Sequence, residues 1–265
     1  MIRVVVLGAL GRMGSLLCAT IERQDDLELV ARVDTADPAA AVAPVSRAPL
    51  FATLGEALAA APADVAVDFT VPASVFDSVA GALAAGLATV VGTTGLSDEQ
   101  VELLSARAAE HDAALLIVPN FALGAVLLMR FAAQAARYFP VAEIIELHEQ
   151  DKVDAPSGTS LRTARLMTEG GAAHVHGAGE ERPSRGLSSG GVRIHSVRLP
   201  GLVAHQEVLF GGEGETLSLR HDSLSRESFM AGALLAIRRA PVLKGTTVGL
   251  EGLLADATGD DETRG

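Results

Sequence analysis

The sequence is poor in cysteine, aromatic residues and lysine. Its 265 residues include one cysteine and no tryptophan, and aromatic side chains make up only 3%. A lone cysteine, Cys18, can form neither an intrachain disulfide nor a cysteine-based zinc site, which is typical of a reducing compartment. Only Lys152 and Lys244 are lysines, so 19 of the 21 Lys and Arg residues are arginine.

Long apolar runs are also missing. Polar residues, Gly or Pro interrupt every hydrophobic segment before the ~18 residues that a membrane-spanning helix needs, and the first residues do not form a leader pattern. We therefore expect a cytoplasmic protein that binds no membrane. The formal net charge of −12 repels phosphate backbones and argues against a nucleic-acid partner, but it leaves room for a local cationic pocket. We expect no metal site, because His174 and His176 lack a third ligand.

Strand-like and helical segments alternate through the first half of the chain. Short runs rich in Val, Leu and Ile are separated by amphipathic segments with capping residues such as Thr53 and Ser97. The expected strands cover 3–7, 27–33, 65–69, 89–91 and 114–118, and the expected helices cover 15–23, 73–85 and segments that start at Thr53 and Ser97. This alternation predicts an α/β fold with a doubly wound parallel sheet of the Rossmann type.

The pattern changes after Asn120. Helices are expected at 123–138 and 159–167, a strand at 142–148, and an exposed loop over the Gly-rich and Ser-rich segment 170–191. Strands at 192–198, 205–210 and 216–220 then follow with short connections, which are typical of antiparallel pairing. The sequence therefore predicts a second, α+β domain with a mainly antiparallel sheet.

A glycine-rich loop lies between the first expected strand and helix. Gly8, Gly11 and Gly14 are spaced three residues apart, which allows a tight turn and a close approach of backbone amides to a pyrophosphate. Asp34 ends the next strand, twenty residues after Gly14, where a carboxylate binds ribose hydroxyls. These residues predict dinucleotide binding. Arg12 could contact a 2′-phosphate or face solvent.

Two further loops follow expected strands. Gly92-Thr93-Thr94-Gly95 and Pro119-Asn120-Phe121-Ala122 would both lie at the carboxyl edge of the sheet, where doubly wound folds bind ligands. Either loop alone could also be an ordinary turn between a strand and a helix.

The densest group of reactive side chains lies between His148 and Thr159. Lys152 stands out in a chain that otherwise uses arginine, and a lysine can give up a proton, so it is a candidate general acid. His148, four residues earlier, titrates near neutrality and could pass a proton. Ser157, Gly158 and Thr159 open a helix whose first amides and hydroxyls would hold a carboxylate. By composition alone this segment could also be a solvated loop.

Taken together, these motifs resemble the 4-hydroxy-tetrahydrodipicolinate reductase family, also called dihydrodipicolinate reductases, of the bacterial diaminopimelate–lysine pathway. The resemblance covers nearly the whole chain. It rests on Gly8–Gly14, Asp68-Phe69-Thr70, Val91–Gly95, Pro119–Gly124, His148 with Lys152-Val153-Asp154-Ala155-Pro156-Ser157-Gly158-Thr159, and Gly201–Phe210. The stretch from Lys152 to Thr159 is the most specific of these motifs.

The resemblance implies an organisation and a reaction. It implies a dinucleotide-binding domain made of residues 1–119 and 228–265, a substrate-binding and oligomerisation domain made of 120–227, hinge closure between them, and a homotetramer. It further implies that NADH, NADPH or both reduce a small dicarboxylate, dihydrodipicolinate, to tetrahydrodipicolinate in lysine biosynthesis.

The resemblance also assigns roles to individual residues. His148 would donate and accept a proton, Lys152 would donate one, and Gly158 and Thr159 would hold a substrate carboxylate. The cofactor-binding residues would be Gly8, Ala9, Leu10, Gly11, Arg12, Met13, Asp34, Gly92, Thr93, Thr94, Pro119, Asn120, Phe121 and Ala122.

One position departs from the family pattern. The family usually has two adjacent histidines, the second of which contacts substrate, and here that position is Glu149. A carboxylate would repel a dicarboxylate unless it turns away or is neutralised. The sequence therefore leaves two alternatives open beside the lysine-pathway reductase. One is a related reductase of another cyclic imine or unsaturated acid, and the other is a non-catalytic NAD(P)-binding regulator.

Overall fold

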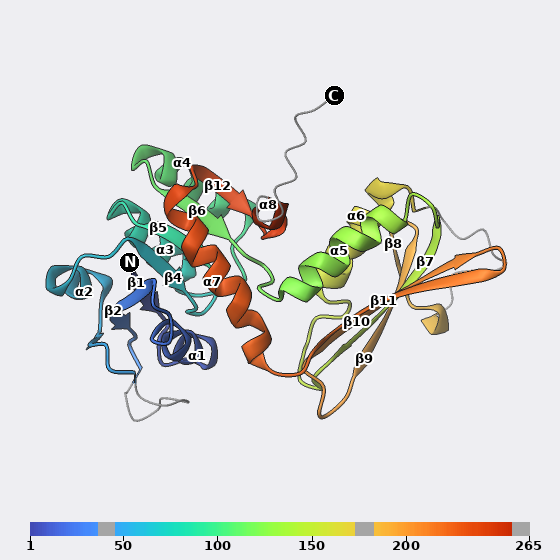
Figure 1. Cartoon of the computed structure of the whole chain (residues 1–265), viewed down its shortest axis with the longest axis horizontal. Coiled ribbons are helices and arrows are strands. Elements are labelled where there is room, and N and C mark those ends of the chain that lie inside the picture. Colours follow the sequence, from blue (N-terminus) through green and yellow to red (C-terminus); the bar gives the residue numbers. More distant parts are fainter. Residues whose placement is uncertain (37–45, 173–182, 256–265) are drawn as a thin grey trace. The chain divides into compact units, whose positions relative to one another are not determined.

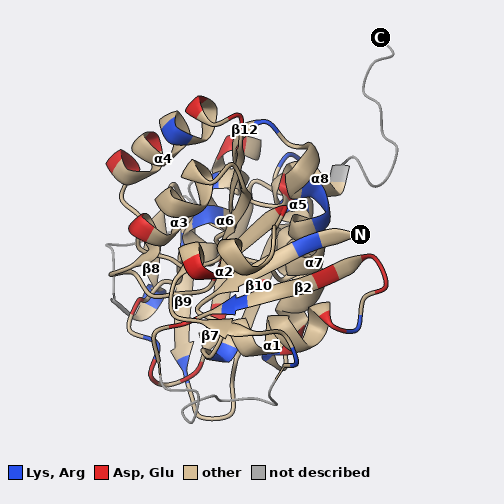
Figure 2. Cartoon of the chain, turned by 90° about the vertical axis from the view of Figure 1, so that its left-hand side faces the viewer, with Lys and Arg blue, Asp and Glu red and all other residues tan. Residues whose placement is uncertain are grey.

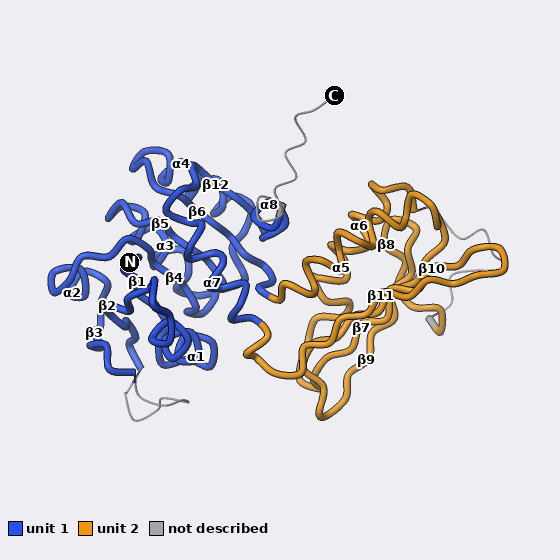
Figure 3. Tube along the Cα trace, in the orientation of Figure 1, with its two compact units in different colours: residues 1–121, 229–265 blue, residues 122–228 orange. Residues whose placement is uncertain are grey.

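The computed structural model describes residues 1–36, 46–172 and 183–255, and divides the chain into two compact units (Figures 1 and 3). Unit 1 comprises Met1–Phe121 and Phe229–Gly265, and unit 2 comprises Ala122–Ser228. The C-terminal segment thus returns to the unit formed by the N-terminal half. No helix in the described ranges is both long and apolar enough to cross a membrane.

Unit 1 is built on a parallel sheet. Its described strands are β1 (Ile2–Leu7), β2 (Leu27–Val33), β3 (Leu50–Phe51), β4 (Val65–Asp68), β5 (Ala88–Val91), β6 (Ala114–Ile117) and β12 (Gly245–Val248). They lie in the order β12-β6-β5-β4-β1-β2-β3, and each pair of neighbours is parallel. This arrangement confirms the predicted doubly wound sheet, with β12 from the C-terminal segment at one edge.

Helices cover both faces of this sheet (Figure 1). The described helices of unit 1 are α1 (Arg12–Ile21), α2 (Leu54–Ala60), α3 (Val75–Ala84), α4 (Asp98–Glu110), α7 (Met230–Arg239) and α8 (Glu251–Ala255), with the 3-10 turn η4 (Ala240–Val242). Small aliphatic side chains of α2, α3 and α4 pack on one face against buried Val and Leu of the strands. Helix α1 contacts α7 and β2. The sheet is therefore buried on both sides, as parallel sheets require.

Local signals place several helix starts correctly. Thr53 and Ser97 each form the predicted capping box, with Glu56 and Gln100 respectively. The helix predicted at 15–23 starts earlier, at Arg12, and the one predicted at 73–85 starts later, at Val75. On α4 the exposed acidic side chains outnumber the basic ones (Figure 2).

Unit 2 contains a mixed sheet. Its described elements are α5 (Leu123–Ala135), β7 (Val141–His148), α6 (Gly158–Gly170), η2 (Pro183–Arg185), β8 (Leu187–Ser189), β9 (Val192–Arg198), β10 (Ala204–Gly212) and β11 (Glu215–Ser223), and η3 (Arg226–Phe229) ends at the boundary. The strand order is β11-β10-β7-β9-β8. Three pairings are antiparallel and the β7–β9 pairing is parallel. The sheet is thus mainly antiparallel, as predicted.

Two sequence-based expectations for unit 2 are wrong. The strands at 192–198 and 205–210 do not pair with each other, because β7 lies between β9 and β10 and hydrogen bonds to both. The segment 170–191 was expected to be a loop, but Leu187–Ser189 pairs with β9 as β8. A three-residue edge strand is too short to give a periodic pattern, so tertiary pairing decides it.

The core of unit 2 lies on one face of its sheet. Leu128, Ala132 and Ala136 from the α5 segment and Ala164 and Met167 from α6 pack against inward-facing strand residues, namely Ala142, Ile144, Val192, Ile194, Val208 and Phe210. Both α5 and α6 therefore cover the same face, and neither covers the opposite one.

We expect Gly232→Ala to lower the stability of the protein. A Cβ at Gly232, in α7, would lie 2.0 Å from the carbonyl oxygen of Phe121, so the helix would have to shift. Such overpacking typically costs about 1–3 kcal/mol in the free energy of unfolding. Urea unfolding followed by circular dichroism measures this loss. The matched control is Gly55→Ala in α2, where the added Cβ meets nothing within 4 Å and the better helix propensity should add up to ~1 kcal/mol. Equal stability of the two variants would contradict the close contact.

Candidate active site

Two glycines hold the N-terminus of α1 close to the carboxyl end of β1. Gly8 has a φ of +75°, and a Cβ there would lie 2.4 Å from the carbonyl oxygen of Phe69. A Cβ on Gly14 would lie 2.1 Å from the carbonyl oxygen of Gly8. Any larger residue would therefore separate the loop from β4 or α1 from the loop.

The N-cap position of α1 has no side chain that could cap the helix. Its N-cap residue is Gly11, in extended conformation, and Arg12 at the first helical position is exposed. The first amides of a helix lack intrahelical acceptors and carry a partial positive charge. The N-terminus of α1 therefore fits the diphosphate of a dinucleotide.

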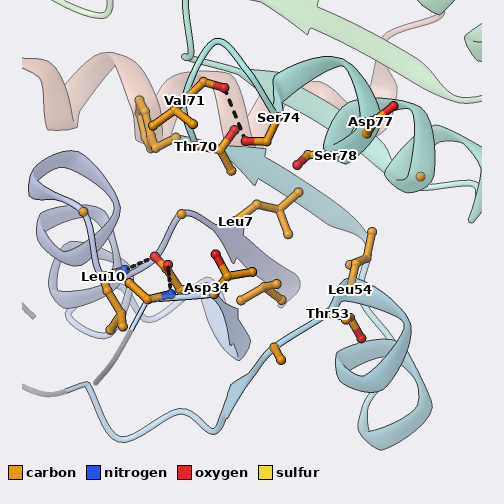
Figure 4. A pocket seen from close by; sticks show the side chains of 18 residues that line it. Leu7, Leu10, Asp34, Thr53, Leu54, Thr70, Val71, Ser74, Asp77 and Ser78 are labelled. Carbon is orange, nitrogen blue, oxygen red and sulfur yellow. Dashed lines mark hydrogen bonds between the residues drawn. The ribbon is translucent and has the colours of Figure 1, made fainter. Parts of the chain in front are cut away.

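A cavity of about 600 Å³ opens beside the loop (Figure 4). Its apolar wall includes Leu7, Leu10, Val33, Leu54 and Phe69, and its polar groups come from Asp34, Thr35, Thr53, Ser74, Asp77 and Ser78. Among the described residues that line it, none is Lys or Arg. A mainly apolar cavity of this size with a few polar groups is typical of a site for a small molecule or cofactor.

Asp34 lies at the end of β2 on the wall of this cavity. Its Oδ2 accepts a hydrogen bond from the amide of Leu10 at 2.8 Å, and its Oδ1 accepts one from the amide of Ala36 at 2.9 Å. These two hydrogen bonds hold the side chain in place. Each carboxylate oxygen can accept a second hydrogen bond, so the side chain can also accept from ribose hydroxyls. The residues present thus fit an adenine dinucleotide.

Asp68 joins two of the loops at the carboxyl edge of the sheet. It ends β4, is completely buried, and its Oδ1 accepts from Thr93 Oγ1 at 2.6 Å and from Thr70 Oγ1 at 2.9 Å. Burial raises the pKa of Asp68, and the hydrogen bonds from Thr93 and Thr70 only partly oppose this rise. The carboxyl group fixes the loop after β5 to the loop after β4.

Aromatic packing brings in the loop after β6. The rings of Phe69 and Phe121 lie 5.4 Å apart between centroids, and a Cβ on Gly92 would lie 2.2 Å from the Phe69 ring. The sequence-predicted cofactor residues from Gly8 to Phe121 therefore lie at one edge of the unit 1 sheet. Ala122, the last of them, is the first residue of unit 2.

In unit 2, His148 is tied to a buried carboxylate. Its Nδ1 is hydrogen-bonded to Glu146 Oε2, and Glu146 is completely buried. Arg198 donates to both Glu146 oxygens, at 2.9 and 3.0 Å. Burial alone would raise the pKa of Glu146, but the hydrogen bonds from His148, Arg198 and Ser196 outweigh it and hold that pKa at about 2. Glu146 is therefore an ionised partner that orients the His148 ring.

Lys152 follows in the loop after β7. Its Nζ donates to Asp154 Oδ1 at 2.6 Å, and this hydrogen bond lowers the pKa of Asp154. Asp154 is exposed, and pairs of this kind contribute at most about 1 kcal/mol. A bound anion could therefore replace Asp154 as the partner of the Lys152 ammonium.

A buried polar network supports the start of α6. Ser157 Oγ lies 2.8 Å from Ser160 Oγ, which donates to Gln206 Oε1 at 3.0 Å, and Gln206 Nε2 donates to Thr163 Oγ1 at 2.8 Å. The hydroxyl of Ser157 is thus directed into the core as the N-cap. A Cβ on Gly158 would meet nothing within 4 Å, so the first turn of α6 faces open space there.

Family models match both units. The model described as dihydrodipicolinate reductase, N-terminus, matches residues 2–121, and the one described as dihydrodipicolinate reductase, C-terminus, matches residues 124–254. The chain belongs to the dihydrodipicolinate reductase family.

Relatives of this reductase family are similar along nearly their full length. The 4-hydroxy-tetrahydrodipicolinate reductase of Cutibacterium acnes is 47% identical over 261 residues, which cover 96% of this chain and 99% of that protein. The protein of the same name from Streptococcus suis is 48% identical over 257 residues, with the same coverage.

Solved structures agree with this membership. The dipicolinate-bound dihydrodipicolinate reductase from Paenisporosarcina sp. TG-14 has a TM-score of 0.85 and 41% identity, and the match covers 95% of this chain and 99% of that chain. A myo-inositol dehydrogenase from Corynebacterium glutamicum, with a TM-score of 0.62 and 18% identity, shares the fold alone.

Glu149 is the departure from the reductase family pattern, and the structure places it at the surface. Its side chain is 52% exposed, and its Oε1 lies 3.9 Å from Nη2 of Arg226. The pair is too open to contribute much stability, but the guanidinium offsets part of the Glu149 charge.

Sequence reasoning assigned no role to several polar residues that support the loops and side chains described above. Asp68 in unit 1 and Glu146, Arg198 and Gln206 in unit 2 each make hydrogen bonds that hold nearby side chains or loops, yet they come from four different strands or strand ends. The only local signal was a charged or polar residue inside an apolar strand, which for Glu146 could have been noticed. His174 and His176 lie outside the described residues, and no group of three or more His, Cys, Asp or Glu in the described part of the chain could hold a metal ion.

We expect the stabilising contribution of Glu146 to disappear at low pH. The folded-state pKa of about 2 lies below the usual 4.5, so the contribution is present above pH ~4.5 and is lost as pH falls towards 2, because the unfolded chain takes up the proton first. It cannot exceed about 3 kcal/mol at neutral pH. Urea unfolding of wild type and Glu146→Gln at pH 7 and pH 3 measures it. The difference in the free energy of unfolding between wild type and Glu146→Gln should be smaller at pH 3 than at pH 7. Glu102→Gln, on the exposed face of α4, is the control for the loss of one carboxylate. A difference in unfolding free energy that does not change with pH would contradict the lowered pKa of Glu146.

Proposed function

We propose that this chain is an NAD(P)H-dependent reductase that converts 4-hydroxy-tetrahydrodipicolinate, through dihydrodipicolinate, to tetrahydrodipicolinate in lysine biosynthesis. The observation that carries the proposal is the group formed by Lys152, the His148–Glu146 pair and the open first turn of α6, in a chain that matches the family in both units. A relative with 41% identity binds dipicolinate, a planar ring with two carboxylates.

In this proposal unit 1 binds the cofactor and unit 2 binds the substrate. Unit 1 binds NADH or NADPH through the glycine-rich loop Gly8–Met13, Asp34 and the loops Gly92–Thr94 and Pro119–Phe121, with Ala122 following directly. Unit 2 binds the dicarboxylate through Gly158, Thr159 and Lys152. The support is the cavity beside Asp34 in one unit and the α6 N-terminus in the other.

The bound nicotinamide would supply a hydride to the unsaturated cyclic imine. The hydride adds to one carbon of the double bond, and the electron pair of that bond moves into the ring to give an enamine. Lys152 Nζ then donates a proton to the enamine carbon, so that one hydride and one proton complete the reduction. A positioned acid of this kind typically contributes about 10²- to 10⁴-fold in rate.

His148 would exchange protons through Nε2. Its Nδ1 is engaged by the ionised Glu146, which fixes the ring orientation and leaves Nε2 as the nitrogen available to substrate or solvent. An imidazolium at this position also stabilises negative charge that develops on the substrate.

The α6 N-terminus would hold one substrate carboxylate. The amides of Gly158 and Thr159 belong to the first turn of a 13-residue helix, whose dipole favours an anion there. The buried contacts of Ser157 and Ser160 with Gln206 keep this turn rigid.

The site favours this reductase over the alternatives. A non-catalytic regulator has no need of an acid such as Lys152 beside an oriented imidazole. A reductase of a different cyclic imine is less well supported, because the relatives at 41–48% identity share the lysine-pathway name and Glu149 is exposed beside Arg226.

We also propose a homotetramer in the cytoplasm. The sheet face of unit 2 that α5 and α6 leave uncovered carries Val141, Ile145, Leu147, Val197 and Leu209, of which Val141 and Leu209 are 38% and 36% exposed. The same face also carries the ion pairs of Glu143 and Glu207, and a surface that mixes apolar side chains with such pairs is typical of contacts between subunits. The single cysteine, buried Cys18, suits a reducing compartment.

Lys152→Ala should lower kcat by about 10²- to 10⁴-fold while the Kd for NADH stays within twofold, because the variant loses the acid and leaves unit 1 intact. The measurement is the loss of NADH absorbance with freshly prepared dihydrodipicolinate. Lys244→Ala, which removes the other lysine and its exposed pair with Asp112, is the matched control and should keep full activity. Wild-type turnover by Lys152→Ala would remove Lys152 from the mechanism, and a wild type that turns over no substrate would overturn the proposed function.

The chain should use NADH at least as well as NADPH. Asp34 accepts from a 2′-hydroxyl but repels a 2′-phosphate, and no Lys or Arg is among the described residues of its cavity. Asp34→Ala should reduce kcat/KM for NADH by about 10- to 100-fold and change the NADPH value less, since one charged hydrogen bond is worth roughly 1.5–3 kcal/mol. Steady-state kinetics with both cofactors tests this. A strong NADPH preference that survives Asp34→Ala would show that the ribose binds elsewhere.

A further inference from the structure

Arg198 is the last residue of β9, and its guanidinium donates five hydrogen bonds. Two go to the carboxylate of Glu146, at 2.9 and 3.0 Å. Two more go to backbone carbonyls of the loop after β7, from Nε to Lys152 at 3.2 Å and from Nη2 to Asp154 at 2.6 Å. The fifth goes to the carbonyl of Val197 at 2.7 Å. The side chain is 18% exposed, so these contacts are largely screened from water.

These contacts join the two residues that the proposed reaction needs. Glu146 orients the imidazole of His148, and the carbonyls of Lys152 and Asp154 flank the side chain of the proposed acid. Backbone pairing adds to the link, since the amide of Leu199, next to Arg198, donates to the carbonyl of His148 at 3.1 Å. One side chain therefore contacts both the carboxylate behind the imidazole and the loop that carries the lysine.

The charges around His148 give Arg198 a second effect. They are Glu146 on its own strand, Arg198 on β9, the Lys152–Asp154 pair in the next loop and the Glu149–Arg226 pair, while the register partner on β10 is Ala204. A buried carboxylate with no other cation would favour the imidazolium form of His148. Arg198 shares the charge of Glu146, so its removal should raise the pKa of His148.

A lysine could not make the same contacts. An ammonium is a point charge with three donors, whereas the five N–H groups of guanidinium lie in one plane and spread over several acceptors. Four acceptor groups, the Glu146 carboxylate, two loop carbonyls and the carbonyl of Val197, accept hydrogen bonds from Arg198. Arg198→Lys would keep the charge and lose part of the link to the loop.

We propose that Arg198 is a positioning residue, which fixes His148 and Lys152 relative to each other and keeps His148 able to exchange a proton. This inference rests on the proposed function for the roles of His148 and Lys152. In this proposal Arg198 acts through His148 and Lys152 and contacts neither the substrate nor the cofactor.

The test compares Arg198→Lys and Arg198→Met with wild type. In Arg198→Lys, kcat should fall about 10- to 100-fold, as expected for a displaced acid, while the Kd for NADH stays within twofold. Amide hydrogen exchange of residues 150–155 should become faster. In Arg198→Met, NMR titration should show a raised pKa for His148, whose signal is assigned with His148→Gln. The matched control, Arg238→Lys, alters an Arg–carboxylate pair in unit 1, with Asp26.

The outcomes separate positioning from a general loss of stability. Wild-type kcat and wild-type exchange in Arg198→Lys would overturn the proposal, and so would a fall in kcat without any change in loop exchange. The proposal is also overturned if Arg238→Lys lowers kcat as much as Arg198→Lys does when both variants lose the same amount of Tm. If Arg198→Met does not fold, Arg198→Lys decides through kcat and exchange. The exchange and NMR measurements need no substrate, so they still test the role of Arg198 if the proposed function fails.

Discussion

A carboxylate buried in unit 2 is kept ionised by partners from two neighbouring strands, and the proposed acid–base residues are linked to this group. Glu146 is completely buried, yet its pKa is held at about 2 by hydrogen bonds from His148, Arg198 and Ser196. Each of these partners sits on β7 or β9, so the parallel pairing of the two strands is what brings them together. Removing one partner from such a group leaves a buried charge uncompensated, which is far more costly than losing a surface pair.

Unit 1 depends on a different constraint, the close approach of backbone segments. Gly8 and Gly14 leave no space for a side chain between the loop, β4 and α1. Asp68 and the Phe69–Phe121 contact then tie the loops after β4, β5 and β6 to the same edge. The result is that these loops lie together at the carboxyl edge of the sheet, where doubly wound folds bind a dinucleotide.

Glu149 is a departure from the family pattern, and the structure shows the surroundings in which it stands. In sequence it stands where a substrate-contacting histidine is usual, and a carboxylate there would repel a dicarboxylate. In the structure it is half exposed beside Arg226, whose charge offsets part of its own. His148 and Lys152, for which we propose the proton transfers, are both linked to Arg198, His148 through the buried Glu146 and Lys152 through its carbonyl.

The sequence by itself determined the fold class, the βα alternation of unit 1 and the motifs for which we propose cofactor binding and proton transfer, because periodicity, capping residues and short spacings are local properties. It also placed Asp34, His148, Lys152 and the α6 start. Only the tertiary structure decided that β7 lies between β9 and β10, that Leu187–Ser189 pairs as β8, and that Glu146, Arg198 and Gln206 support the site. The hydrogen bonds between Arg198 and Glu146 alone join residues 52 positions apart, and no local pattern records which distant strands will become neighbours.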